Sequence, residues 1–265
     1  ILVHYNQIMK TLLSWSGGKD SALALRALRR DANIELVGLL TTLSQEHDRI
    51  SMHGVRSELL DLQSCAAGLS SWRVAIPAPT SDCPICPIED SDCPVEQDTN
   101  CPIDTSGTPY DAAMGAAMKE AVSQGVEAIA FGDIFLEDLR AYREKRLAEV
   151  GLKAIFPLWG RDSTELFEEF IAAGFHAITT CVDGSKLDQS WVGRPLDAAF
   201  LADYKAQYPD LDPCGENGEF HSFVTNGPVF SRPVDYKLAE TVSRDSFWFQ
   251  DLLPIGAPAC SLQYP

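Results

Sequence analysis

The stretch Leu12-Leu13-Ser14-Trp15-Ser16-Gly17-Gly18-Lys19-Asp20-Ser21 joins an apolar run to a polar, glycine-containing turn. Helix-forming residues follow at 22–28, so the pattern predicts a strand, a tight loop and a helix. Such a loop aims backbone N–H groups at phosphate, and its glycines let a phosphate oxygen approach closely. Serine hydroxyls and a lysine on an exposed loop would add donors, and Asp20 could cap the helix or help to hold Mg²⁺. We therefore predict a phosphate-binding loop at 16–21.

The residue order Ser-Gly-Gly-Lys-Asp-Ser resembles the loop of the PP-loop ATP pyrophosphatases. A Walker loop is excluded, because the four-residue spacer between its glycines and its Gly-Lys-Ser/Thr ending are both missing. The alternative interpretation is an ordinary strand–turn–helix connection. Six matching residues between a strand and a helix make that alternative the weaker one.

Length and charge narrow the class of protein further. The chain has 265 residues, of which 45% are hydrophobic, which suits one large globular domain or two modest ones. Asp and Glu number 38 against 21 Lys and Arg, and the formal net charge of −17 makes nucleic acid an unfavoured partner, although a local basic patch could exist. No apolar run approaches the ~20 residues that cross a bilayer, so we expect no membrane partner.

The first residues of the chain and its cysteines indicate in which compartment of the cell the protein is expected. Residues 1–8 have neither the charged start nor the cleavage site of a signal peptide, and Met9 is a natural start for the first strand. We therefore expect residues 1–8 to lie outside the native protein. We also expect a cytoplasmic location, where the eight cysteines would be mostly reduced.

Strands and helices alternate along most of the chain. Helical patterns separate apolar runs that predict strands at 11–15, 34–41, 72–76, 126–131, 153–158 and 175–182. The alternation predicts right-handed crossovers and a parallel sheet, an α/β fold. Aromatic residues, prolines and glycines dominate after Trp159, with short strands expected at 219–225 and 234–249. We therefore predict a PP-loop ATP-binding domain at 9–158 and a smaller C-terminal α+β domain at 159–265 that carries the acceptor site.

An insertion at 80–109 interrupts this alternation with prolines and acids. It contains four cysteines, each followed by proline: Cys83, Cys86, Cys93 and Cys101. Four thiolates could bind zinc or an iron–sulfur cluster. Nearby carboxylates raise thiol pKa values and so weaken metal binding. We favour a flexible insertion without metal, and keep the metal site and disulfides as alternatives.

Ligands of an open α/β sheet bind beyond the carboxyl ends of its strands. Thr41 closes the second predicted strand, where its backbone could meet adenine, and Gly132-Asp133 follow the fourth strand. Asp133 would lie near the phosphates, where a carboxylate is useful for holding Mg²⁺. The alternative role for Asp133 is that of an ordinary turn residue at a strand end.

A second group of polar residues lies in Asp212-Pro213-Cys214-Gly215-Glu216-Asn217-Gly218-Glu219-Phe220-His221-Ser222-Phe223. Its two glutamates, three positions apart, flank a glycine next to a histidine and a predicted strand. A flexible turn with paired carboxylates suits binding of Mg²⁺, an amine or ammonium. A hairpin turn with solvated acids is the alternative.

In their order along the chain, these motifs resemble the diphthine–ammonia ligase family, a PP-loop group with a small C-terminal domain. The resemblance covers about Met9 to Phe230, and its segments are 16–21, 52–56, 131–134 with Arg140 and 143–144, 157–159 and 215–221. The Gly-Glu-Asn-Gly-Glu stretch after Pro-Leu-Trp is the specific part. Asn217, where the family often has glycine, resembles the bacterial branch, whose substrate need not be diphthine. The cysteine-rich insertion is a further departure.

The resemblance implies an ATP-dependent amide ligase. A carboxylate would attack the α-phosphorus of ATP, pyrophosphate would leave, and ammonia would displace AMP from the acyl-adenylate. The residues implied to hold pyrophosphate are Ser16, Gly17, Gly18, Lys19 and Ser21. Asp20 and Asp133 would place Mg²⁺, and the acceptor and ammonia side would be lined by His53, Arg140, Glu216, Glu219 and His221. For His53 and His221, purely structural roles are the alternatives.

The implied partners are ATP, ammonia and a carboxylate acceptor on a small molecule or a protein, and a homodimer is left open. This chemistry requires residues 215–221 near the phosphate loop. We therefore predict that the C-terminal domain folds back over the carboxyl ends of the strands. This would bring Glu216 and Glu219 into one cleft with Ser16, Asp20 and Asp133.

Two other functions compete with this one. A PP-loop enzyme that adds sulfur to tRNA would use Cys83 and Cys86, but it needs a basic track that a net charge of −17 disfavours. A nucleotide-binding regulatory module without turnover would not require Ser16, Lys19 and Asp20 together. The products formed from ATP would separate these functions.

Overall fold

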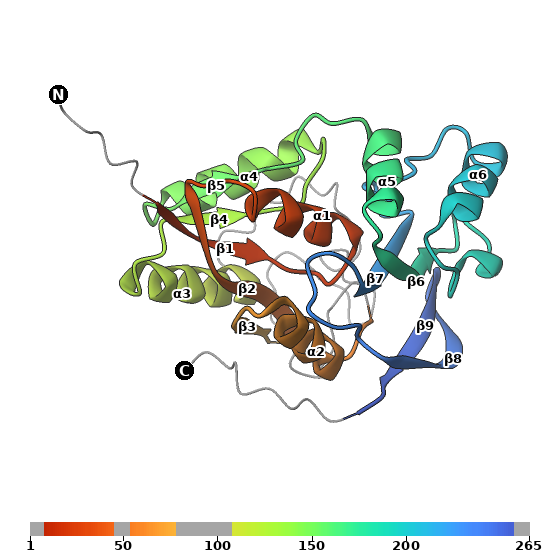
Figure 1. The fold of residues 1–265 in the computed structure, drawn as a ribbon. Coiled ribbons are helices and arrows are strands. Elements are labelled where there is room, and N and C mark those ends of the chain that lie inside the picture. The colour runs from red at the N-terminus through yellow and green to blue at the C-terminus, as the bar shows by residue number, and fades with distance from the viewer. Residues whose placement is uncertain (1–7, 45–53, 78–107, 257–265) are drawn as a thin grey trace.

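The computed structural model describes residues 8–44, 54–77 and 108–256, which form two β-sheets (Figure 1). The first sheet has five parallel strands in the order β3-β2-β1-β4-β5. Its strands are β1 (Met9–Ser14), β2 (Ile34–Ser44), β3 (Ser71–Ile76), β4 (Ala128–Ala130) and β5 (Lys153–Ile155). The helices that alternate with them are α1 (Lys19–Leu28), α2 (Ser57–Ala67), α3 (Pro109–Ser123) and α4 (Glu137–Ala148). The predicted α/β fold class is confirmed.

Helices cover both faces of this sheet because neighbouring strand residues point to opposite sides. Leu13 and Leu39 belong to the apolar cluster that includes α1 and α2. Leu12 and Leu40, one position away, belong to a second cluster that includes α3 and α4. With both faces buried, the edge at the carboxyl ends of the strands is where a ligand can approach.

The second sheet is antiparallel, with the strand order β7-β6-β9-β8. Its strands are β6 (His176–Asp183), β7 (Phe220–Asn226), β8 (Tyr236–Arg244) and β9 (Phe247–Pro254). The segments α5 (Ser163–Ala172), η2 (Gln189–Trp191) and α6 (Ala198–Gln207) pack together through aromatic rings. Phe167 of α5 stacks on Phe200 of α6 at 5.7 Å, and Trp191 meets Phe200 edge-on at 5.1 Å. These rings anchor the helices beside the sheet.

The two sheets are joined by backbone hydrogen bonds and by an ion pair. The amide of Val224 in β7 donates to the carbonyl of Gly17, at 2.9 Å, and Ser231 N donates to Ala66 O, at 2.7 Å. Arg56, just before α2, pairs with Asp251 of β9 at 2.7 Å. The prediction that the C-terminal part folds back toward the phosphate loop is therefore confirmed. The domain boundary at 158/159 stays a prediction, because one apolar cluster runs through both sheets.

Strand β2 is longer than the sequence pattern predicts. Residues 41–44 pair with Arg73–Ile76 of β3, so that Thr41 lies within the strand and Ser44 closes it. The polar residues Thr42 and Ser44 hid this extension, because serine and threonine after an apolar run are also typical of a loop. Most of the 80–109 insertion lies outside the described residues, and α3 begins at Pro109 with Thr108 as its N-cap.

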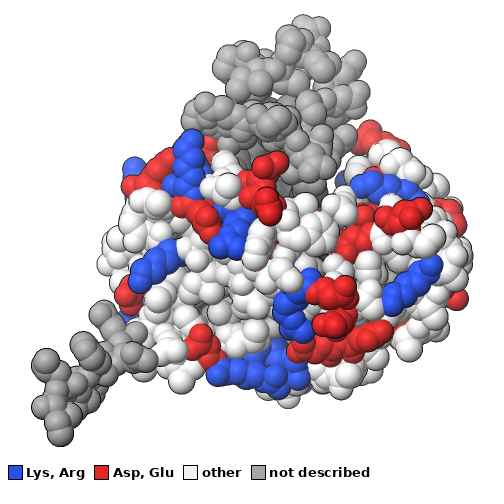
Figure 2. Space-filling view, turned by 90° about the horizontal axis from the view of Figure 1, so that it is seen from above, with Lys and Arg blue, Asp and Glu red and all other residues white. Residues whose placement is uncertain are grey.

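The surface of the described residues carries charges of both signs. On the face seen in Figure 2, Lys and Arg side chains are interspersed with Asp and Glu and do not form a continuous basic tract. Among the helices that the structure describes, none is both long and apolar enough to cross a membrane.

Candidate active site

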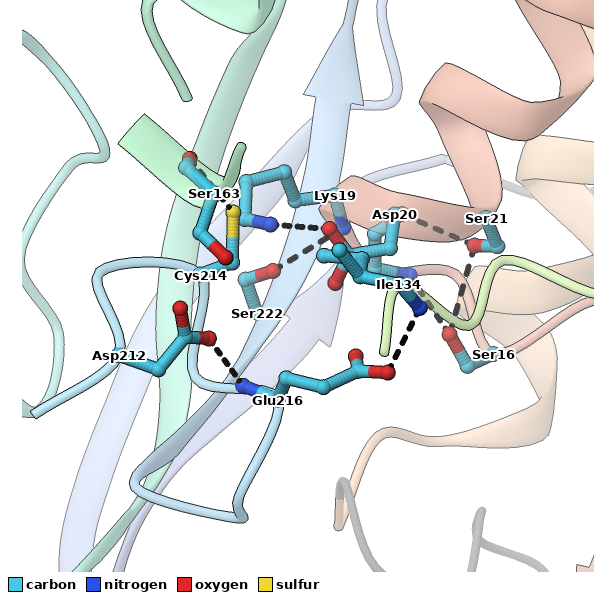
Figure 3. Close-up of polar contacts among 11 residues, drawn as sticks. Ser16, Lys19, Asp20, Ser21, Ile134, Ser163, Asp212, Cys214, Glu216 and Ser222 are labelled. Atoms are coloured by element: carbon cyan, nitrogen blue, oxygen red, sulfur yellow. Dashed lines mark hydrogen bonds and ion pairs between the residues drawn. The ribbon is translucent and has the colours of Figure 1, made fainter. Parts of the chain in front are cut away.

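The phosphate loop follows β1 and leads directly into α1 (Figure 3). Gly17 has φ +79°, a left-handed conformation that glycine adopts without strain. Gly18 occupies the N-cap position, and its amide donates to Ser16 Oγ at 3.3 Å. The Ser21 hydroxyl donates to the Gly18 carbonyl at 2.9 Å. These contacts form a compact turn in front of the helix N-terminus, where the aligned peptide dipoles favour an anion.

Lys19 is buried and does not lie on an exposed loop, so this part of the sequence prediction is wrong. Its side chain is 1% exposed, and its ammonium pairs with the Asp20 carboxylate beside it (Figure 3). Burial disfavours the ammonium, but Asp20 and Cys214 together outweigh burial, and the pKa of Lys19 is raised above its ordinary value. Burial also raises the pKa of Asp20, and Lys19 limits that rise. The pair thus joins a buried ammonium to a carboxylate that is 27% exposed.

Residues of the C-terminal sheet, distant in sequence, bury Lys19. Ser222 of β7 accepts a hydrogen bond from the Lys19 backbone amide at 3.1 Å. Cys214 interacts with the Lys19 ammonium and lies near the carbonyl of Ser163, with Sγ 3.1 Å from that oxygen. Burial raises the pKa of the Cys214 thiol to about 12, so the thiol stays protonated at neutral pH. The sequence placed Cys214 and Ser222 in the second polar stretch but gave no signal that they enclose Lys19.

Asp133 lies beyond the end of β4, as predicted, and is held by an arginine that had no predicted role. Arg143 of α4 pairs with the Asp133 carboxylate at 2.8 Å, while its guanidinium lies 4.2 Å from the ring centre of Phe131. Burial raises the pKa of Asp133, Arg143 lowers it, and the negative charge of Asp20 raises it again. The charge of Asp20 thus acts on Asp133, which places the two carboxylates in one electrostatic site.

Gly132 brings the β4 end against the start of α1. A Cβ atom at Gly132 would lie 2.9 Å from the backbone carbonyl carbon of Asp20, which is closer than side-chain carbons approach. The backbone therefore passes the loop at a distance that only glycine permits without a shift. This contact fits the predicted place of Gly132 beside the phosphate loop.

Glu216 reaches this site from the C-terminal part of the chain (Figure 3). Its Oε1 accepts a hydrogen bond from the Ile134 amide at 2.8 Å, and its own amide donates to Asp212 Oδ2 at 2.8 Å. Burial and the negative charge of Asp20 raise the pKa of Glu216 to about 8. The predicted approach of Glu216 to the loop is confirmed, and its catalytic role stays a prediction.

Glu219 lies differently from Glu216. Its side chain is 1% exposed, and Oε1 accepts hydrogen bonds from the Asp212 amide and the Asn217 side chain, both at 3.3 Å. Its charge also acts on Tyr204 of α6, whose pKa is raised first by burial and then by Glu219. These contacts fix the 212–218 turn from within the C-terminal domain. The structure therefore gives Glu219 a role in holding the turn, and a catalytic role stays a prediction.

The remaining predicted residues are more scattered. Thr41 donates its hydroxyl to the Trp15 carbonyl at 2.9 Å, and His221 lies on β7 opposite Cys181 of β6. Arg140 pairs with Glu144 at 2.8 Å. Its guanidinium lies 4.6 Å from the Trp159 ring centre. His53 and the four cysteines of the insertion lie outside the described residues.

The described residues contain no group of three or more His, Cys, Asp or Glu side chains arranged to hold a metal ion. The donors nearest the phosphate loop are carboxylate oxygens, the ligands that Mg²⁺ prefers. Asp20 and Asp133 already have cationic partners in Lys19 and Arg143. The site therefore combines a helix N-terminus, one lysine and three carboxylates with raised pKa values.

Two family models match this chain in the order of its two sheets. Residues 9–76 match the diphthamide synthase N-terminal domain. Residues 162–253 match the diphthamide synthase C-terminal domain. The first match contains the phosphate loop and the second contains the Glu216 turn. The phosphate loop thus belongs to one matched domain and the Glu216 turn to the other.

Curated relatives carry the name diphthine–ammonia ligase. The chain is 30% identical to the cattle protein (Bos taurus) over 127 residues, which are 46% of this chain and 47% of the relative. The zebrafish protein (Danio rerio) is 30% identical over 46% of this chain and 49% of its own length. The Schizosaccharomyces pombe protein is 28% identical, over 46% of this chain and 20% of the relative. The chain thus spans about half the length of these vertebrate relatives. With its matched domains in order over more than half of its residues, the chain belongs to the diphthine–ammonia ligase family.

Proposed function

We propose that this protein is an ATP-dependent ligase that forms an amide from a carboxylate and ammonia. The carboxylate oxygen would attack the α-phosphorus of ATP and release pyrophosphate, and ammonia would then displace AMP from the acyl-adenylate. The observation that carries the proposal is the hydrogen bond from the Ile134 amide to Glu216. It joins the turn specific to this family to the edge of the sheet that carries the phosphate loop.

The loop supplies what a departing pyrophosphate needs. Its backbone amides and the N-terminus of α1 stabilise negative charge that grows as the α,β-bond breaks. Lys19 adds a cation fixed by burial, which costs little reorganisation during the reaction. Ser16 and Ser21 would add hydroxyl donors by exchanging the hydrogen bonds that they make here, from Ser16 to Ser21 Oγ at 3.3 Å and from Ser21 to the Gly18 carbonyl at 2.9 Å.

Mg²⁺ is part of the proposal because the carboxylates of the site would repel the phosphates of ATP unless a cation lay between them. Asp20 and Asp133 are the residues that would hold it, and it would supply positive charge to the phosphate oxygens. Their chemistry fits, because each is a carboxylate whose buried negative charge raises the pKa of the other or of Glu216. Arg143 of α4 forms an ion pair with Asp133, and Lys19 forms one with Asp20 at the start of α1.

Glu216 is placed to serve the second half-reaction. It comes from the C-terminal part of the chain and reaches the loop, where an acyl-adenylate would form. With a pKa raised to about 8, its ionised form could accept the proton that the attacking ammonia loses, and that proton would then pass to solvent or to the departing AMP. Arg140 and His221 remain proposed contacts for the acceptor. The relatives are named diphthine–ammonia ligases, so diphthine is the first acceptor to test.

The test is the fate of labelled substrate. An acceptor with ¹⁸O in its carboxylate should transfer one ¹⁸O to AMP when ammonia is present, with pyrophosphate as the other product of ATP. ADP and phosphate as the only products would overturn the proposal. AMP without label would show that water or another oxygen, and not the carboxylate, attacks the α-phosphorus.

A further inference from the structure

Gln63 of α2 is a fully buried polar residue that contacts the phosphate loop. Its side chain is 0% exposed and makes three hydrogen bonds. Oε1 accepts from Trp15 Nε1 at 2.9 Å, while Nε2 donates to the Gly17 carbonyl at 3.0 Å and to the Val224 carbonyl at 2.6 Å. One amide group therefore connects β1, the phosphate loop and β7.

The fit between Gln63 and Gly17 is close. A Cβ atom at Gly17 would lie 2.7 Å from Gln63 Oε1, so the loop passes Gln63 where only glycine fits. The Gly17 carbonyl also accepts the Val224 amide at 2.9 Å. Two donors from two different elements thus fix the direction of this single carbonyl.

Because the direction of the Gly17 carbonyl is fixed, the direction of the Gly18 amide that follows it is fixed as well. The peptide group is planar and trans, so the Gly18 N–H points away from the Gly17 C=O. The Gly17 carbonyl faces Gln63 and β7, and the Gly18 amide therefore faces the opposite side, where it meets Ser16 Oγ. That is the side on which the loop and the α1 N-terminus would receive phosphate.

A purely space-filling role does not account for Gln63. An amide buried without partners costs free energy, and an apolar side chain would fill an α2 core position without that cost. Gln63 instead donates hydrogen bonds to the loop and to β7. The same strand contains Ser222, which accepts a hydrogen bond from the Lys19 backbone amide.

We propose that Gln63 is a positioning residue, which sets the phosphate loop in its ligand-binding conformation and couples that conformation to β7. The proposal rests on the proposed function for the identity of the ligand, a pyrophosphate group. It makes two claims: Gln63 restrains the loop backbone, and this restraint serves phosphate and not adenosine.

The restraint is tested by amide hydrogen exchange in the free protein. Gln63→Met keeps the size and removes all three hydrogen bonds, and Gln63→Glu keeps only the acceptor for Trp15. Ser64→Ala is the matched control, because Ser64 is equally buried on α2 and bonds only within the helix, to Leu60 O at 2.9 Å. Exchange at Gly18, Lys19 and Val224 should be roughly tenfold faster in both Gln63 variants than in the control. Equal exchange in all three variants would overturn the restraint.

The use of the restraint is tested by calorimetric binding of inorganic pyrophosphate and of adenosine, well below the melting temperature. Both Gln63 variants should bind pyrophosphate roughly tenfold more weakly than Ser64→Ala, with adenosine affinity unchanged. Equal loss for both ligands would indicate general destabilisation and overturn the positioning role. If the wild-type protein formed no AMP from ATP, the ligase proposal would fail on its own, while exchange and pyrophosphate binding would still decide the role of Gln63.

Discussion

Glu216 Oε1 lies 2.8 Å from the backbone nitrogen of Ile134, a residue 82 positions earlier in the chain. Ile134 follows Asp133, and Asp133 shares its electrostatic environment with Asp20 of the phosphate loop. The contact therefore brings a carboxylate from the C-terminal turn into the field of two carboxylates from the parallel sheet. Most properties of the candidate site follow from this crowding of acids around one buried lysine.

The pKa of Glu216 predicts how stability depends on pH. An ordinary glutamate ionises near pH 4.5, whereas the folded site keeps the Glu216 proton up to about pH 8. The folded state thus binds this proton more tightly than the unfolded state, and the stabilisation is complete below the unfolded pKa and lost as pH rises toward 8. Relative to Glu216→Gln, the urea midpoint of the wild type should fall as the pH rises from 4.5 to about 8. Because Asp20 and Asp133 are present in both proteins, a difference that stays constant would contradict the raised pKa.

Removal of the Lys19 ammonium should cost stability as well as activity. Lys19→Met leaves the half-buried Asp20 carboxylate without its partner, and the loss of a partner at such a site costs roughly 1–3 kcal/mol. Urea unfolding measures this cost. The double variant Lys19→Met with Asp20→Asn should recover much of it, because no uncompensated charge remains. A single variant as stable as wild type would show that solvent or another residue takes over the charge of Asp20.

Arg143 should matter for activity as well as for folding. Arg143→Gln leaves Asp133 without its cation, and loss of such a supporting partner costs roughly 10–100-fold in activity or metal affinity. Turnover of ATP and Mg²⁺ dependence are the measurements. Arg146→Gln is the control on the same helix, since Arg146 pairs with Glu149 and Asp111 instead. Similar losses in both variants would assign the effect to α4 as a whole.

Gly132→Ala should destabilise the protein although alanine is a small residue. The added Cβ would meet the Asp20 backbone, which cannot move without the start of α1, and overpacking of this kind costs about 1–3 kcal/mol. Gly115→Ala in α3 is the matched control, because a Cβ there meets nothing within 4 Å. The control should gain roughly 0.5–1 kcal/mol of stability, as expected for alanine in a helix interior. Equal thermal shifts for both variants would contradict the close approach at Gly132.

The sequence predicted the parts of the fold that depend on local patterns. Alternating apolar runs predict the parallel sheet and its helices, and the Ser-Gly-Gly-Lys-Asp-Ser order predicts the loop, because both patterns lie within short windows. Strand β2 was predicted too short because its last residues, from Thr41 onward, are mostly polar and are held in the sheet by β3.

The burial of Lys19 could not be predicted in the same way. A lysine next to two glycines has the local pattern of an exposed loop. Its burial depends on Ser222, 203 positions later, and on Cys214, whose side chains reach it only after the second sheet has docked. For the same reason the pattern did not separate Glu216, which faces the loop, from Glu219, which faces its own turn.

The hydrogen bonds from β7 to the phosphate loop also set an order of events during synthesis. The loop residues Gly17 and Lys19 leave the ribosome some 200 residues before Val224 and Ser222, their backbone partners. At about 5–20 residues per second, that interval is roughly 10–40 s. For this time the nascent chain carries the loop sequence without the strand that shapes it. A phosphate ligand would therefore meet a formed loop only after the C-terminal sheet has been made, so that binding depends on synthesis of the second sheet.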